Sequence, residues 1–262
     1  MSDRSSDIRN GLVATLYAAL VVLFLLGPIV IAVIVGFSSG SRLEFPIPGV
    51  SLRWFREALS NIHYQQGLWN SLVIGLGNAV IATVVGTCAA LALNRYVFTG
   101  RAIMQVMMML PLAMPGIILG LGLLFTLAAY HMNAGLPVAT LGHAVIGVPY
   151  VVAMVTASLA NYDRSLERAS MSLGVGPVGT FFKVTLPLIK SGIIAGAISS
   201  FLISFDNFSL SLFITRGDTL PLRLMQQLMS YADPSIAAIS TLLVILSLVL
   251  LIFLLPVASR SK

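Results

Sequence analysis

The sequence has 262 residues, of which 58% are hydrophobic and only 9% are charged. In soluble domains roughly a quarter of the residues are charged, so this composition excludes an ordinary soluble protein and predicts an integral membrane protein. The net charge of +6 does not indicate a nucleic-acid partner, because the basic residues stand singly at the ends of apolar runs. That pattern is typical of membrane topology.

Apolar runs in the sequence are long enough to cross a membrane, since a transmembrane helix needs about 20 residues. Six are predicted, over residues 11–37, 68–93, 103–129, 141–160, 188–212 and 236–256. Pro111 and Pro115 are expected to kink the third run, and the polar residues 204–209 to interrupt the fifth. Because no linker or repeat divides the chain, we predict an all-α integral membrane protein with a single domain, residues 1–262.

The basic residues also predict the orientation. The N-terminus, residues 94–101, residues 161–190 and the C-terminal tail together carry ten Lys and Arg, whereas the alternate loops carry five. Basic residues favour the cytoplasmic side, so both termini and the 161–190 loop are expected in the cytoplasm. The segments near residues 42–63, with some local helix, and 215–234 are expected to be external loops.

The polar segment between the fourth and fifth runs, residues 161–187, is predicted to begin with a short amphipathic helix. Leu166, Ala169 and Leu173 recur at the spacing of one helix face. Asp163 stands at the N-cap position. Gly174 follows where this helix should end, at a position that usually needs positive φ.

A second short helix is expected after the glycine. Pro177 suits its first position, and the helix presents Phe181, Phe182 and Val184 before Pro187 ends the segment. Two short helices joined at a glycine between membrane spans are suited to insertion into a groove on another protein.

This segment resembles the "EAA" loop of binding-protein-dependent ABC importer permeases, whose pattern is Glu-Ala-Ala, three residues, Gly, nine residues and Ile-x-Leu-Pro. Gly174, Leu186 and Pro187 match, and Val184 replaces the isoleucine. The three leading positions fall on residues 168–170, so that arginine replaces the motif's glutamate. The resemblance implies a cytoplasmic coupling loop, residues 161–187, that contacts a separate ATPase through Glu167, Arg168, Ala169, Ser170, Leu173, Gly174, Phe181, Leu186 and Pro187.

The resemblance extends to residues 204–213, 220–222 and 232–238, which look most like the second permease of spermidine/putrescine-type importers. It implies the type I importer permease fold, with six transmembrane helices, in a bacterial inner membrane. The implied partners are a second, usually non-identical permease, two cytoplasmic ATPases that hold ATP and Mg, and a periplasmic solute-binding protein. The chain itself would bind no cofactor. Importers of iron, thiamine, phosphonate or opines use similar permeases, so these substrates stay open beside polyamines.

One carboxylate lies well inside a predicted span. Asp206 falls in the fifth run, at a depth where an ionised group is costly unless it faces water, a partner or the bundle interior. Phenylalanines on either side could contact an amine by cation–π interaction. The candidate substrate pathway is therefore Ser204, Phe205, Asp206 and Asn207. Alternatively, Asp206 caps a broken helix or pairs with the partner permease.

Enzyme signatures are missing from the sequence. It contains no phosphate-binding loop of the Gly-x-x-x-x-Gly-Lys-Ser/Thr type, no metal-ligand spacing and no catalytic motif. His63, His131 and His143 stand alone and are interpreted as loop or packing residues. A different class, a carrier driven by an ion gradient, would usually spread ionisable groups through its spans, and only Asp206 qualifies here.

Overall fold

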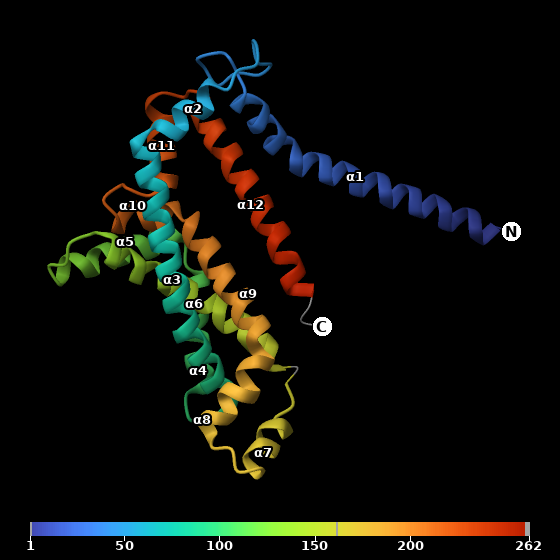
Figure 1. The fold of residues 1–262 in the computed structure, drawn as a ribbon, viewed down its shortest axis with the longest axis vertical. Coiled ribbons are helices and arrows are strands. Elements are labelled where there is room, and N and C mark those ends of the chain that lie inside the picture. Colours follow the sequence, from blue (N-terminus) through green and yellow to red (C-terminus); the bar gives the residue numbers. More distant parts are fainter. Residues whose placement is uncertain (1, 161, 260–262) are drawn as a thin grey trace. The chain divides into compact units, whose positions relative to one another are not determined.

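The computed structural model describes residues 2–160 and 162–259, and the side chains of residues 13–160 and 162–249 (Figure 1). In this part of the chain the regular elements are helices, and no strand is present. The predicted all-α class is confirmed. Two compact units are formed, one by residues 1–61 with 224–257 and the other by residues 62–223 with 258–262, and they are described separately.

The first unit contains α1 (Ser2–Gly36), α2 (Arg53–Ser60), the C-terminal part of α11 (Leu220–Ser230) and α12 (Ser235–Ser259). Gly36 lets α1 approach α12 closely. A Cβ at Gly36 would lie 3.0 Å from the Thr241 hydroxyl oxygen and 3.1 Å from the Ala237 carbonyl oxygen. Trp54 of α2 is buried, and its ring N–H donates to the Gly40 carbonyl at 2.9 Å.

The second unit is built around α3 (Ile62–Arg95), α6 (Leu136–Ala160) and α9 (Leu186–Phe205), which pack on one another (Figure 1). Small residues allow this approach: a Cβ at Gly86 would lie 2.7 Å from the Val151 Cβ, and one at Gly196 would lie 2.9 Å from the Val151 Cα. Close packing through small residues is typical of helices inside membranes. Val151, Val155 and Ile189 are fully buried at this junction.

The remaining elements of the second unit are shorter. They are α4 (Arg101–Ala113), α5 (Gly116–Ala129), α7 (Ser165–Ser172), α8 (Pro177–Thr180), a π-helical turn (Phe181–Thr185) and α10 (Phe208–Ile214). The helices α7 and α8 lie together at one end of the unit, and α10 packs on α5 (Figure 1). We refer to the end that carries α7 and α8 as the loop end.

The third predicted span is not one kinked helix. Its two parts, α4 and α5, are bent by 106° at the break between them. Met114 is extended there, with φ −86° and ψ 134°, as expected for a residue before proline, and Pro115 stands at the start of α5. Pro111, in contrast, lies inside α4 without ending it.

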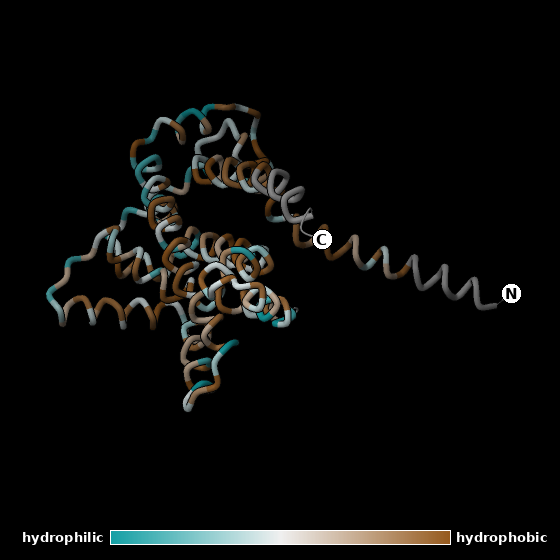
Figure 2. Tube along the Cα trace, turned by 60° about the horizontal axis from the view of Figure 1, so that its bottom comes forward, coloured by the Kyte–Doolittle hydropathy of each residue, from teal (hydrophilic) through white to brown (hydrophobic). Residues whose placement is uncertain are grey.

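Apolar residues run along the long helices, and hydrophilic residues gather in the turns (Figure 2). Within the described residues, four helical segments are long and apolar enough to span a membrane, and α4 with α5 would make a fifth. The apolar part of α12 is described only to Val249. The membrane class is therefore confirmed, whereas the number of six spans stays a prediction.

Two further expectations concern the C-terminal half. The fifth run is broken as predicted, because α9 ends at Phe205 and α10 begins at Phe208. The predicted external loop at residues 215–234 contains a helix, α11, that sequence reasoning missed. Its signal was a set of leucines and methionines interspersed with Arg223, Gln226 and Gln227, a pattern typical of an amphipathic helix. Leu220 and Leu222 of this helix are buried.

Candidate functional site

The coupling-loop candidate opens with Asp163. Its carboxylate accepts hydrogen bonds from the Ser165 backbone N–H at 2.8 Å and the Ser165 hydroxyl at 2.6 Å. These bonds hold the pKa of the Asp163 carboxyl below its usual value. The helix α7 starts one residue later than predicted, with Arg164 rather than Asp163 at the N-cap position. Residue 161, where the predicted loop begins, lies outside the described residues.

Gly174 ends α7 as predicted, with φ +85°. Its N–H donates to the Met171 carbonyl at 3.0 Å, and the Val175 N–H donates to the Ser170 carbonyl at 3.2 Å. This pair of bonds is the Schellman motif, which closes a helix around a left-handed residue. No atom lies within 4 Å of the place a Cβ would take, so the backbone conformation, not crowding, requires glycine here.

An ion pair holds α7 to the rest of the unit. Arg95, the last residue of α3, binds the Glu167 carboxylate. The Thr185 hydroxyl donates to Glu167 at 2.6 Å and accepts from Arg95 at 3.0 Å. Arg168, which takes the motif's glutamate position, is exposed and forms no ion pair with a described residue. The loop carboxylate that pairs with Arg95 is therefore Glu167, one residue before the position of the motif's glutamate.

The charge state of Glu167 follows from this setting. Burial acts to raise the pKa of its carboxyl, but the hydrogen bond from Thr185 and the charge of Arg95 outweigh burial, and the pKa lies below its usual value. Because this pKa is lower in the folded chain than in the unfolded chain, the ionised carboxylate stabilises the folded state at pH values above its ordinary pKa of 4.5. The stabilisation is lost as the pH falls through the pKa of the folded chain.

The apolar side chains of the loop are exposed. Leu173 is 84% exposed and Phe182 60%, and Leu166, Met171 and Val178 are also exposed. Phe181 is half-buried, with its ring 5.0 Å from that of Phe182. Ala169 and Pro187 are exposed, and Ser170 and Leu186 are half-buried. Because large exposed apolar patches often mark interaction sites, these side chains are candidates for an interaction surface.

Replacing Glu167 by glutamine is expected to loosen α7, because it removes the negative partner and leaves Arg95 half-buried without one. A hydrogen bond to a charged group contributes about 1.5–3 kcal/mol, so amide hydrogen exchange in α7 should accelerate about tenfold or more at neutral pH. The matched control is Arg168→Gln, which should leave the exchange rates unchanged. Equal effects of the two substitutions would contradict the assignment of the ion pair to Glu167.

The second candidate region is the break between α9 and α10. Asp206 is the C-cap residue of α9; it is exposed, and its carboxylate makes no hydrogen bond or ion pair with the described residues. The side-chain cap of α10 comes from Asn207, whose amide oxygen accepts from the Leu210 N–H at 2.8 Å. The Asp206 carboxylate therefore does not cap either helix at the break in this structure.

The neighbours of Asp206 divide into two groups. Phe205 is half-buried and stacks on Phe201 with ring centroids 5.6 Å apart, so two phenylalanines on the N-terminal side of Asp206 lie together. Ser204 does not share the exposed site. It is 4% exposed and its hydroxyl lies 2.8 Å from a ring nitrogen of His143. Sequence reasoning missed this contact, although a lone histidine inside an uncharged run was the available signal.

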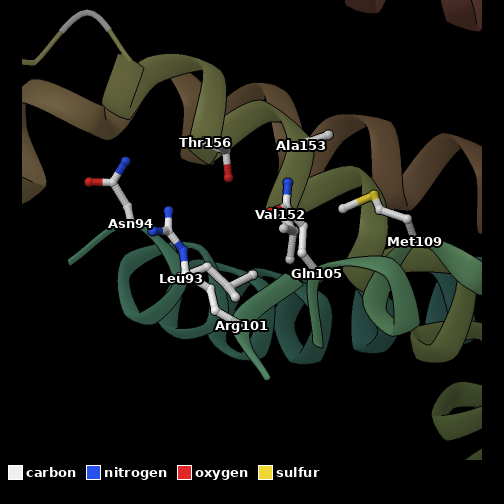
Figure 3. Close-up of a pocket in the computed structure, with 8 residues that line it drawn as sticks. All are labelled: Leu93, Asn94, Arg101, Gln105, Met109, Val152, Ala153 and Thr156. Carbon is white, nitrogen blue, oxygen red and sulfur yellow. The ribbon is translucent and has the colours of Figure 1, made fainter. Parts of the chain in front are cut away.

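A cavity of about 270 Å³ opens near the loop end. Figure 3 shows polar groups of Arg101, Gln105 and Thr156 facing it from α4 and α6. Its lining is Leu93, Asn94, Arg101, Gln105, Met109, Val152, Ala153 and Thr156. No lining residue comes from α9 or α10, so this cavity is not part of the Asp206 site. Its one charged lining residue, Arg101, is a cation and would repel an amine.

Comparison with known proteins identifies the family. The model of the family "Binding-protein-dependent transport system inner membrane component" matches residues 82–260. The chain belongs to this family. Among its relatives, the putrescine transport system permease protein PotI of Escherichia coli K12 is 33% identical over 229 residues, or 84% of this chain and 81% of that protein. The spermidine/putrescine transport system permease protein PotC of the same strain is 28% identical over 247 residues, or 94% and 91%.

Solved structures of ABC importers have a fold similar to that of this chain. A bacterial ABC transporter involved in import of the polysaccharide alginate matches 97% of this chain and 97% of that chain, with a TM-score of 0.72 and 14% identity. The methionine ABC transporter MetNI, inward-facing, matches 76% of this chain and 95% of that chain, with a TM-score of 0.62 and 17% identity. The predicted importer permease fold is confirmed. As a member of this family the chain is a transport subunit of the inner membrane and not an enzyme.

Proposed function

We propose that this chain forms half of the membrane pathway of an ATP-driven importer for polyamines such as putrescine and spermidine. The observation that carries the substrate class is the extent of likeness to the two polyamine permeases, over 84% and 94% of the chain. The exposed Asp206 supports it, because it directly follows Phe205, whose ring stacks on Phe201, and ammonium groups bind carboxylates and aromatic faces.

Another substrate has weaker support. The probable molybdenum ABC transporter permease HVO_B0370 of Haloferax volcanii is 31% identical, but over 153 residues, which is 55% of this chain. No particular residue favours that reading or the iron, phosphonate, thiamine and opine alternatives. A polyamine is therefore the substrate class that we propose.

The assembly that we propose contains a second, non-identical permease, two cytoplasmic ATPases that hold ATP and Mg, and a periplasmic solute-binding protein. The chain itself binds no cofactor. Both termini and the α7–α8 loop lie in the cytoplasm, supported by the ten basic residues on that side against five on the other. The exposed Leu173 and Phe182 side chains are the docking surface for an ATPase.

Cross-linking and uptake test this proposal on the purified complex. In a Cys88→Ser background, Leu173→Cys should cross-link to a co-purifying ATPase. The control Trp69→Cys should not, because Trp69 is exposed but lies near the N-terminal end of α3, the end opposite Arg95. Proteoliposomes with internal ATP and the solute-binding protein outside should accumulate putrescine or spermidine. Cross-linking from residue 69 alone would overturn the orientation, and polyamine uptake without ATP would overturn the mechanism.

A further inference from the structure

His143 of α6 is fully buried, at 0% exposed, and contacts both sides of the α9–α10 break. Its Nδ1 lies 2.8 Å from the hydroxyl oxygen of Ser204, in the last turn of α9. Its Nε2 lies 3.3 Å from the hydroxyl oxygen of Ser211, in α10. One rigid ring therefore bridges the two helices that leave Asp206 and Asn207 between them.

The chemistry of this bridge is complete. A neutral imidazole carries one N–H donor and one acceptor nitrogen, and a serine hydroxyl can donate or accept, so either tautomer satisfies both contacts. Ser204 and Ser211 are 4% and 1% exposed, so water does not compete for these bonds. An ionisable side chain inside a membrane span, with named polar partners, is a functional-site hypothesis by default.

A second polar crossing lies one helical turn away. The Asn78 amide of α3 donates to the Ser200 carbonyl at 2.7 Å and to the Ser200 hydroxyl at 2.9 Å. Gly147 of α6 makes room for it, since a Cβ there would lie 2.4 Å from both the Asn78 amide oxygen and the Ser200 hydroxyl oxygen. Polar bonds thus tie α3, α6, α9 and α10 together at two levels of the bundle, one helical turn apart.

The bridge also joins the two helices that flank the coupling-loop candidate. α6 ends at Ala160, just before α7, and α9 begins at Leu186, just after the π-helical turn. His143 is seventeen residues before Ala160, which is about 25 Å along the helix at about 1.5 Å per residue. A displacement of α6 at the loop end would therefore reach the break through this ring.

We propose that His143 is a positioning residue that fixes the α9–α10 break, and with it the direction in which Asp206 and Asn207 face. Through the ring, movement of the loop helices is passed along α6 to the substrate pathway. The pathway role of Asp206 rests on the proposed function, whereas the clamping of the break does not depend on the substrate.

The first test uses labelling and needs no substrate. In assembled complex with Cys88→Ser and Asp206→Cys, the rate at which a water-soluble maleimide labels residue 206 reports the geometry of the break. Loss of two hydrogen bonds changes a local equilibrium by about tenfold, so His143→Leu should change that rate by about tenfold, and His143→Gln, which can donate and accept, should restore it. The matched control Thr140→Val should have no effect, because the Thr140 hydroxyl donates only within α6, to the Leu136 carbonyl at 2.8 Å.

The second test measures uptake with residue 206 intact. His143→Leu and Ser211→Ala should raise the KM for putrescine or spermidine, and together they should do no more than the first alone, because they break the same bridge. Unchanged labelling rates in both His143→Leu and Ser211→Ala would overturn the inference. If the His143→Leu complex does not assemble, Ser211→Ala alone decides, and we expect it to change the labelling rate about threefold. Altered labelling in a complex whose unmutated form imports no polyamine would reject the polyamine function and keep the positioning role.

Discussion

Replacing Gly174 by valine is expected to abolish ATP-driven uptake while the permease still inserts in the membrane. The φ of +85° at Gly174 costs an L-residue about 1–2 kcal/mol, and a β-branched residue more. Valine meets no atom there, so the strain is relieved by unwinding the turn, which changes the angle between α7 and α8. The uptake rate and the amount of ATPase that co-purifies measure the effect.

Gly176 offers a matched control in the same loop. Its backbone is extended, with φ −64° and ψ 164°, its Cβ position is also empty, and it precedes Pro177, where extended backbone suits valine. Gly176→Val should therefore transport nearly normally. Gly174→Asn should keep part of the activity, since asparagine enters the left-handed region more readily. Normal uptake and assembly in Gly174→Val would refute the coupling role of this turn.

Local signals made most of the loop predictable. The conformation of Gly174 and the helix start at Pro177 depend on residues within one turn, so the sequence alone contains the reasons for them. The same holds for the interruption at residues 204–209, where polar residues follow an apolar run. These features need no knowledge of distant contacts.

Contacts between distant segments explain the misses. The ion pair of Glu167 depends on Arg95, and the contacts of His143 depend on Ser204 and Ser211, all more than sixty residues away in the sequence. The 106° bend between α4 and α5 follows a proline that predicts a break but not its angle. That angle is set by packing, as at Gly120 of α5, where a Cβ would lie 2.7 Å from the Phe213 ring.

Replacing Asp206 by asparagine is expected to lower polyamine uptake about tenfold in a complex that still assembles. The change nearly keeps the shape of the side chain and removes its charge. Asp206 lies sixteen residues past Lys190, roughly 24 Å along a helix. A carboxylate at such depth costs about 2.5–3.5 kcal/mol unless it faces water or a partner. Because Asp206 is exposed in the single chain, we expect it to face either a water-filled pathway or the second permease in the complex.

The pathway role predicts a particular pattern among variants of this carboxylate. A contact between an ammonium group and Asp206 worth about 1.4 kcal/mol would appear as a tenfold rise in the KM. Asp206→Glu, which keeps the charge, should recover part of the affinity. Glu57→Gln is the control, because it removes the charge of another exposed carboxylate, one that lies outside the predicted spans, and it should leave the KM unchanged.

Assembly and uptake together separate the two remaining roles of Asp206. If the carboxylate contacts the substrate, Asp206→Asn complexes should contain both permeases and the ATPases in normal amounts and fail in uptake alone. If it pairs with the second permease, removal of the charge leaves a buried partner charge unpaired, which costs about 3–5 kcal/mol, and the complex should fall apart on purification. Wild-type uptake of a cationic substrate by an intact Asp206→Asn complex would eliminate the pathway role, because a cation contact cannot be lost without weaker binding.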